Sequence, residues 1–174
     1  MFKALPPDLG AVMVLLGDGK LRTLLQEEAR GLPIAFPGFV ADRRALARAL
    51  ASSDIYVSGM ADETFGVSVL EAQASGLPVV GVASGAMIDR VPEGTGLLGP
   101  VDDAAAMAAN VASLWRGDHA GTRQRSLALA GTHNRWDQTF DHLIRVEYSA
   151  ALAARDARRV KGWSLPIRRA LDVS

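Results

Sequence analysis

The feature that most constrains the fold is an alternation of short apolar runs with helical patterns along the first hundred residues. Five apolar runs are expected to be strands, at residues 11–17, 34–36, 55–57, 79–82 and 97–98. The first, AVMVLLG, is apolar throughout, as is typical of a parallel strand buried on both faces. Strands that alternate with helices form right-handed βαβ units. The sequence therefore predicts an α/β fold, a Rossmann-like parallel sheet with helices on both faces.

Helices are expected between the strands and after them. Their ranges are about 20–30, from 42, 66–75, 87–91, 104–115, 120–130 and 136–154. Asp42 is expected to cap the second helix, and Asp102 or Asp103 the fifth. Because the strand patterns stop near residue 100, C-terminal helices should follow the sheet. We therefore divide the chain into a sheet domain with its helices, residues 1–154, and a C-terminal tail, residues 155–174.

Composition argues against several functional classes. The chain has 19 Lys and Arg against 19 Asp and Glu, so no net charge attracts it to nucleic acid. It has no cysteine, which excludes disulfides, thiolate metal sites and cysteine nucleophiles and agrees with a reducing cytosol. No apolar stretch reaches the ~20 residues needed to cross a bilayer. We expect a cytoplasmic protein.

The tail, residues 155–174, is basic and contains Trp163 and Ile167 among its Arg and Lys side chains. Three interpretations remain open: a solvated chain end, an anchor on anionic lipid headgroups, and docking on another domain. The second interpretation would make the protein peripheral at the inner face of a membrane.

The segment most informative about chemistry is ETFGVSVLEAQASGLPVV, residues 63–80. In open α/β sheets a diphosphate binds outside the carboxyl ends of the strands, at the free amides of a helix start. Gly66 would let the backbone approach a phosphate closely, and Thr64 is expected to cap the helix. The amides of Phe65, Gly66 and Val67 would then receive the diphosphate.

Two glutamates flank this helix start. Glu71 falls in the second turn, where a carboxylate can accept hydrogen bonds from two hydroxyls of a ribose. Glu63 precedes the helix, so its expected partners are hydroxyls of a sugar attached beyond the phosphates.

These residues resemble the signature of glycosyltransferase family 4, whose members have the GT-B fold. Glu63 and Glu71 have the E-x7-E spacing of that family, and EAQASGLPVV, residues 71–80, is similar to its EAmAsGlPVV signature. The resemblance extends over about residues 5–150. It includes further similarities at residues 17–19 (GDG), 36–40 (FPGFV), 51–57, 84–86 and 96–98. The same context argues against the alternative that the two glutamates are the acid and nucleophile of a glycosidase.

The resemblance implies a role for each residue of the site. Glu71 would bind the ribose of a nucleotide sugar, and Glu63 would be the catalytic residue beside the donor hexose. Further donor contacts are implied at Phe65, Gly66, Val67, Gly17 and Val40, the last against the nucleobase. Because no DxD motif occurs, no metal is implied, and no cofactor is expected besides the nucleotide-sugar donor, which is a substrate.

Two departures from the family pattern affect these expectations. Val57 is followed by SGMA, residues 58–61, where the family has a Pro-Ser or His-Pro-Gly element. The family's basic turn, whose Arg and Lys neutralise the diphosphate, and its N-terminal acceptor domain are expected to lie before Met1. Lys20 and Arg22 are then the basic side chains expected near the diphosphate.

The sequence therefore predicts the donor-binding portion of a retaining glycosyltransferase. It would transfer a hexose to a lipid, a saccharide or a small-molecule acceptor, and the isolated chain is expected to be inactive. The alternative is a non-catalytic nucleotide-sugar-binding module or an inactive fragment.

Overall fold

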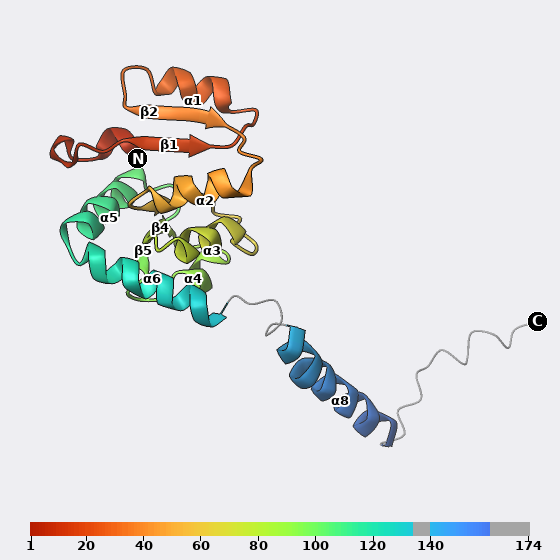
Figure 1. Cartoon of the computed structure of the whole chain (residues 1–174). Helices are drawn as coiled ribbons and strands as arrows, with labels where there is room; N and C mark the ends of the chain where they lie inside the picture. The colour runs from red at the N-terminus through yellow and green to blue at the C-terminus, as the bar shows by residue number, and fades with distance from the viewer. Residues whose placement is uncertain (134–139, 161–174) are drawn as a thin grey trace, which may run out of the picture. The chain divides into compact units, whose positions relative to one another are not determined.

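A computed structural model describes residues 1–133 and 140–160 and divides the chain into two compact units (Figure 1). The first unit is Met1–His133, and the rest of the chain belongs to the second. The sequence placed the end of the sheet domain and its helices further along, at residue 154. Residues 155–160 of the predicted tail continue a helix. Residues 161–174 of the tail lie outside the described residues.

Five strands form two parallel ladders in the first unit. One ladder pairs β1 (Met13–Leu16) with β2 (Ile34–Gly38). The other contains β3 (Tyr56–Val57), β4 (Val79–Val82) and β5 (Gly96–Gly99) in that order. The predicted α/β class and the parallel direction of the strands are confirmed. Among the described residues, however, the expected sheet is split into two ladders.

Strand β1 is not buried on both faces, so that part of the prediction is wrong. Its residues alternate between part-buried and exposed, and the side chains on the open face, those of Val14 and Leu16, are 49% and 38% exposed. Within the described part of the chain, β1 has only β2 as a ladder partner. Strand β4, which has a partner on each side, is buried at all four positions.

Alternate residues of β4 face two different groups of helices. Val80 and Val82 pack with residues of α5 (Ala104–Arg116), namely Met107, Val111 and Leu114. Val79 packs on the other side with Val69 of α3 (Val67–Ala74) and Met87 of α4 (Met87–Arg90). The second ladder is therefore flanked by helices on both faces, as the sequence predicts.

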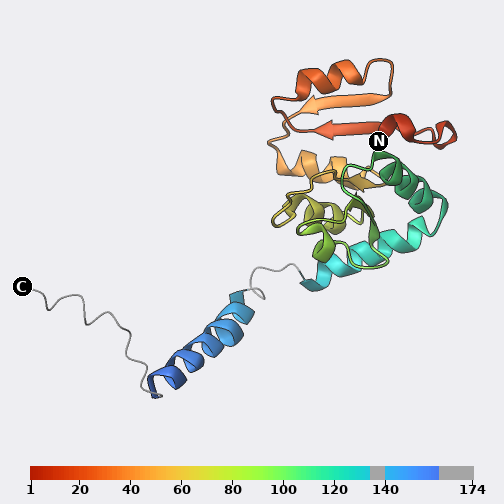
Figure 2. The same cartoon turned by 180° about the vertical axis from the view of Figure 1, so that it is seen from behind.

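The remaining helices of the first unit are α1 (Arg22–Glu28), α2 (Arg43–Ala51) and α6 (His119–His133), with 3-10 turns η1 (Phe2–Ala4) and η2 (Pro7–Leu9). In Figures 1 and 2, β1, β2 and α1 lie at one end of this unit, and α3 to α6 lie with the second ladder at the other. The predicted caps at Asp42 and Asp103 are confirmed, since their carboxylates accept the amides of Arg44 at 2.9 Å and Ala106 at 2.8 Å.

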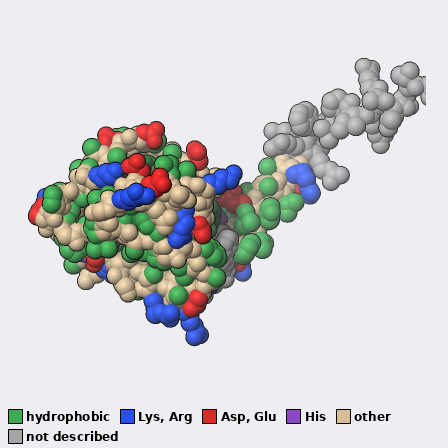
Figure 3. Space-filling model, turned by 90° about the horizontal axis from the view of Figure 1, so that it is seen from above, with side chains coloured by type: hydrophobic (Ala, Val, Ile, Leu, Met, Phe, Trp, Pro, Cys, Tyr) green, Lys and Arg blue, Asp and Glu red, His purple; other side chains and the backbone are tan. Residues whose placement is uncertain are grey.

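The second unit is helical where it is described. A π-helical segment, η3 (Leu143–Tyr148), leads into α8 (Ser149–Val160). The sequence predicts a helix at 136–154, of which residues 136–139 lie outside the described residues. None of the helices described in either unit is long and apolar enough to cross a membrane. Acidic and basic side chains are interspersed on the face of the protein shown in Figure 3.

Candidate functional site

The 58–66 loop, which joins β3 to α3, carries Glu63 and lies at the carboxyl ends of β3 and β4. At its start, the Ser58 amide donates to the Val80 carbonyl at 3.0 Å. Further along, the Ala86 amide, which follows β4, donates to the Glu63 carbonyl at 2.8 Å. A parallel sheet collects ligand-binding loops at this edge, so the position of Glu63 agrees with the sequence argument.

The Glu63 carboxylate is bonded to the start of α3. Its Oε1 accepts the Gly66 amide at 2.8 Å and the Phe65 amide at 3.3 Å. Two of the three amides expected to receive a diphosphate therefore have an acceptor within the protein. The expected cap at Thr64 is wrong: Gly66, in the left-handed region with φ of 78°, is the N-cap residue, and Glu63 supplies the carboxylate. A left-handed backbone of this kind favours glycine.

Glu71 lies on α3, as predicted, and forms an ion pair that the sequence analysis did not foresee. Arg43 Nη2 is 2.9 Å from Glu71 Oε1. The Glu71 side chain is 27% exposed, whereas that of Arg43, at the start of α2, is 81% exposed. Arg43 precedes Glu71 by 28 residues, and no local pattern in the sequence links the two positions.

A second arginine missed by the sequence analysis contacts the 58–66 loop. Arg90, the last residue of α4, has its guanidinium carbon 4.5 Å from the centroid of the Phe65 ring, and its Nε donates to the Phe65 carbonyl at 2.9 Å. Its own carbonyl accepts Nε2 of the fully buried Gln73 at 2.6 Å. Helix α4 follows the carboxyl end of β4, and this position is the one signal that could have suggested Arg90.

The other predicted residues lie in or next to the first ladder and its helix α1. The Gly17 amide donates to the Gly38 carbonyl at 2.8 Å, and Val40 lies part-buried in the link from β2 to α2. Arg22 donates to the Phe36 carbonyl at 2.9 Å, and Lys20 is exposed. The described contacts thus join Glu63 to Phe65 and Gly66, and Glu71 to Arg43. They do not tie Gly17 or Val40 to either glutamate.

Within residues 1–133 and 140–160, no group of three or more His, Cys, Asp or Glu side chains is placed to hold a metal ion.

The chain is similar to curated mannosyltransferases of mycobacteria. The chain is 41% identical over 86 residues to a GDP-mannose-dependent alpha-(1-6)-phosphatidylinositol dimannoside mannosyltransferase of Mycobacterium tuberculosis, a match that covers 49% of this chain and 23% of that protein. It is 38% identical over 151 residues to a GDP-mannose-dependent alpha-mannosyltransferase of Mycolicibacterium smegmatis, covering 84% of this chain and 38% of that protein. The chain thus spans less than two fifths of the length of these relatives.

Solved structures show the same fold. Anabaena HepE in complex with UDP matches with a TM-score of 0.70 and 23% identity, over 85% of this chain and 44% of that chain. The C-terminal domain of a glycosyl transferase group 1 family protein from Francisella tularensis matches with a TM-score of 0.60 and 17% identity, over 76% and 91% of the two chains. These likenesses show the GT-B glycosyltransferase fold.

The comparison with family models gives the most direct assignment. The model of the glycosyl transferases group 1 matches residues 2–117, which include the two glutamates and both arginines of the site. This match covers more than half of the chain, and it agrees with the resemblance derived from the E-x7-E spacing. The chain therefore belongs to the group 1 glycosyl transferases.

Proposed function

We propose that this chain is the donor-binding portion of a retaining glycosyltransferase, which transfers a hexose from a nucleotide-diphosphate sugar to a lipid, saccharide or small-molecule acceptor. The observation that carries the proposal is the Glu71 carboxylate, mostly buried on α3 in a chain of this family. A carboxylate in this environment can accept hydrogen bonds from both hydroxyls of a ribose.

The geometry of Glu63 supports a contact with the donor hexose. The two backbone amides that donate hydrogen bonds to this carboxylate both donate to Oε1. A hydroxyl of the hexose would therefore contact Oε2. The amides of Phe65 and Gly66 hold the carboxylate in place before a donor binds, which favours a preorganised site.

In the proposed transfer, the bond between the anomeric carbon and the donor diphosphate breaks, and its electron pair stays on the diphosphate oxygen. The acceptor hydroxyl oxygen forms the new bond to the anomeric carbon with retention of configuration, and its proton passes to the leaving diphosphate oxygen. Negative charge that develops on the leaving diphosphate is stabilised by nearby amides and basic side chains.

The binding site is tested by calorimetric titration of the chain with GDP-mannose, for which the mycobacterial relatives are named, and with UDP-glucose. We expect a dissociation constant no tighter than about 1 mM. The physical reason is that two of the three amides expected to receive the diphosphate, those of Phe65 and Gly66, already donate to the Glu63 carboxylate. We expect no sugar transfer, because the chain spans less than two fifths of the relatives' length.

Two variants locate the site. Glu71→Ala should abolish donor binding, since it removes the acceptor of the ribose hydroxyls. Asp103→Ala is the matched control, an acid removed from the start of α5, and should leave donor binding unchanged. Equal binding by Glu71→Ala and the unaltered chain would refute the assignment of Glu71. Micromolar affinity or measurable transfer would show that the chain does more than the proposal allows.

A further inference from the structure

We propose that Arg43 is a positioning residue of the donor site, which pairs with the Glu71 carboxylate and orients it toward the ribose. The proposal rests on the function proposed above, because that function assigns Glu71 to the ribose. Its structural basis is the ion pair between Arg43 Nη2 and Glu71 Oε1, which joins the start of α2 to the middle of α3.

The burial of the two side chains shows which partner needs the other. Glu71 is only 27% exposed, so its charge is partly removed from water and benefits from a counter-charge. Arg43 is 81% exposed and therefore loses little hydration by providing it. The contact engages Oε1, and a carboxylate has about four lone-pair sites, so positions remain for two ribose hydroxyls.

The position of Arg43 within its helix is unfavourable for the helix itself. Arg43 and Arg44 are the first two residues of α2, where the positive end of the helix dipole disfavours cations. Asp42 caps the helix, but the first turn contains no acid. Helix stability therefore does not account for an arginine at position 43. Sites where a local rule is broken in this way are often functional sites.

Arg43 should also reduce the electrostatic repulsion between the Glu71 carboxylate and the negatively charged donor. A nucleotide diphosphate carries negative charge and would be repelled by an unpaired carboxylate in the same site. The ion pair with Arg43 makes the pair neutral and reduces that repulsion. Arg22, which the sequence suggested for this purpose, instead donates to the Phe36 carbonyl.

The test is a titration of the ¹⁵N-labelled chain with GDP-mannose, in which NMR shift changes give the dissociation constant. The variants are Arg43→Ala, Arg43→Lys and the matched control Arg44→Ala, which removes the same charge from the same helix turn. We expect Arg43→Ala to raise the dissociation constant about fivefold, the upper end for an exposed ion pair. Arg43→Lys should stay within about twofold of the unaltered chain, because an ammonium group still supplies the charge. Arg44→Ala should have no effect.

A double-variant cycle separates positioning from direct contact. In Glu71→Gln, whose amide oxygen still accepts a hydroxyl, adding Arg43→Ala should cause no further loss, because Arg43 acts through the charge of Glu71. A further fivefold loss there would make Arg43 a direct ligand and overturn the proposal. Thermal unfolding of each variant checks folding. Both variants remove an unfavourable cation from the helix start, but Arg43→Ala also removes the ion pair with Glu71, so its unfolding temperature should be slightly lower than that of Arg44→Ala.

The failure of this inference is distinguishable from the failure of the proposed function. If Glu71→Gln weakens donor binding while Arg43→Ala behaves like Arg44→Ala, the role of Arg43 is refuted and the donor site stands. If neither GDP-mannose nor UDP-glucose shifts any resonance at tens of millimolar, the proposed function fails, and the role of Arg43 fails with it.

Discussion

At the scale of single residues, Gly85 is a position where the chain comes close to the backbone of the 58–66 loop. Its φ is 53°, and a Cβ atom there would lie 2.5 Å from the Glu63 carbonyl oxygen and 3.2 Å from that of Ala61. Both neighbours are backbone atoms, which cannot rotate away as the end of a side chain can. Gly85 therefore helps to fix the backbone from which the Glu63 carboxylate extends.

We predict that Gly85→Ala lowers the free energy of unfolding by about 2 to 4 kcal/mol. About 1 to 2 kcal/mol comes from the left-handed backbone, and the rest from displacing the loop. Gly31 is the matched control: its φ is 77°, but no atom lies within 4 Å of an added Cβ, so Gly31→Ala should cost only the backbone term. Urea denaturation of the full chain measures both losses, and equal losses would contradict the close approach at Gly85.

The site shows which of its residues the amino-acid sequence could predict and which it could not. The spacing of Glu63 and Glu71 is local, and it correctly places Glu71 on a helix that opens at Gly66. The partners of the site are not local. Arg43 and Arg90 reach it from other helices, and their directions depend on how those helices pack. Thr64 was expected to cap the helix because its side chain suits that role, but the backbone places Gly66 there.

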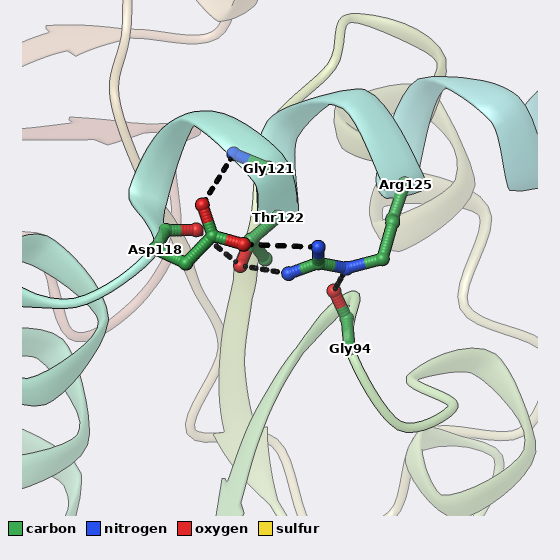
Figure 4. A network of polar contacts seen from close by, with 5 residues as sticks. All are labelled: Gly94, Asp118, Gly121, Thr122 and Arg125. Carbon is green, nitrogen blue, oxygen red and sulfur yellow. Dashed lines mark hydrogen bonds and ion pairs between the residues drawn. The ribbon is translucent and has the colours of Figure 1, made fainter.

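At the scale of elements, a polar network holds the start of α6 to the turn before β5 (Figure 4). The Asp118 carboxylate accepts the Gly121 amide at 3.0 Å and Arg125 Nη1 at 3.0 Å. Arg125 also donates through Nε to the Gly94 carbonyl at 2.7 Å and through Nη2 to the Thr122 hydroxyl at 2.9 Å. The network therefore combines the cap of one helix with a contact to the neighbouring segment.

This network predicts a pH dependence of stability. The hydrogen bond from Arg125, followed by that from the Gly121 amide, lowers the pKa of Asp118 below its ordinary value. A carboxyl whose pKa is lower in the folded state stabilises the fold above its unfolded pKa, about 3.9, and this stability is lost as the pH falls through the folded pKa. We predict that Asp118→Asn, which can still cap the helix, lowers the unfolding temperature at pH 7 and flattens its fall below about pH 5.

Arg125→Gln is the partner variant for this measurement, because it removes the main cause of the lowered pKa of Asp118. Thermal scans from pH 7 to pH 2 should show a similar flattening for the two variants. An acid-side profile equal to that of the unaltered chain would contradict the role of the pair.

The strands show how far periodicity predicts elements. Strand β4 was predicted with its bounds and is buried throughout, because its apolar run is enclosed by a strand on each side. The equally apolar run at β1 has one face open, since burial depends on neighbours that a local pattern does not reveal. The same reason explains why the sequence could not foresee the separation into two ladders.

At the scale of the whole molecule, the α/β class follows from the order of strands and helices, which is a local property repeated along the chain. The division into two units after His133, in contrast, does not follow from any local sequence pattern. Helical patterns occur before and after it, and they do not indicate which helix packs on the strands. Helix α6 is held in the first unit by specific contacts: Arg123 Nη1 donates to the Ser53 carbonyl at 3.0 Å, and the buried Ser126 hydroxyl donates to the Thr95 carbonyl at 3.1 Å.

These contacts predict where the chain can be shortened. A chain that ends at His133 should keep the main unfolding transition within about 2 °C, because the first unit retains its core and α6. A chain that ends at Gly117, where the family match ends, loses α6 and leaves the buried Thr95 carbonyl without Ser126. Its unfolding temperature should fall by more than about 10 °C, since several kcal/mol of packing and hydrogen bonding are removed. Differential scanning calorimetry compares the two, and a large fall on removing only residues 134–174 would show that the first unit depends on the second.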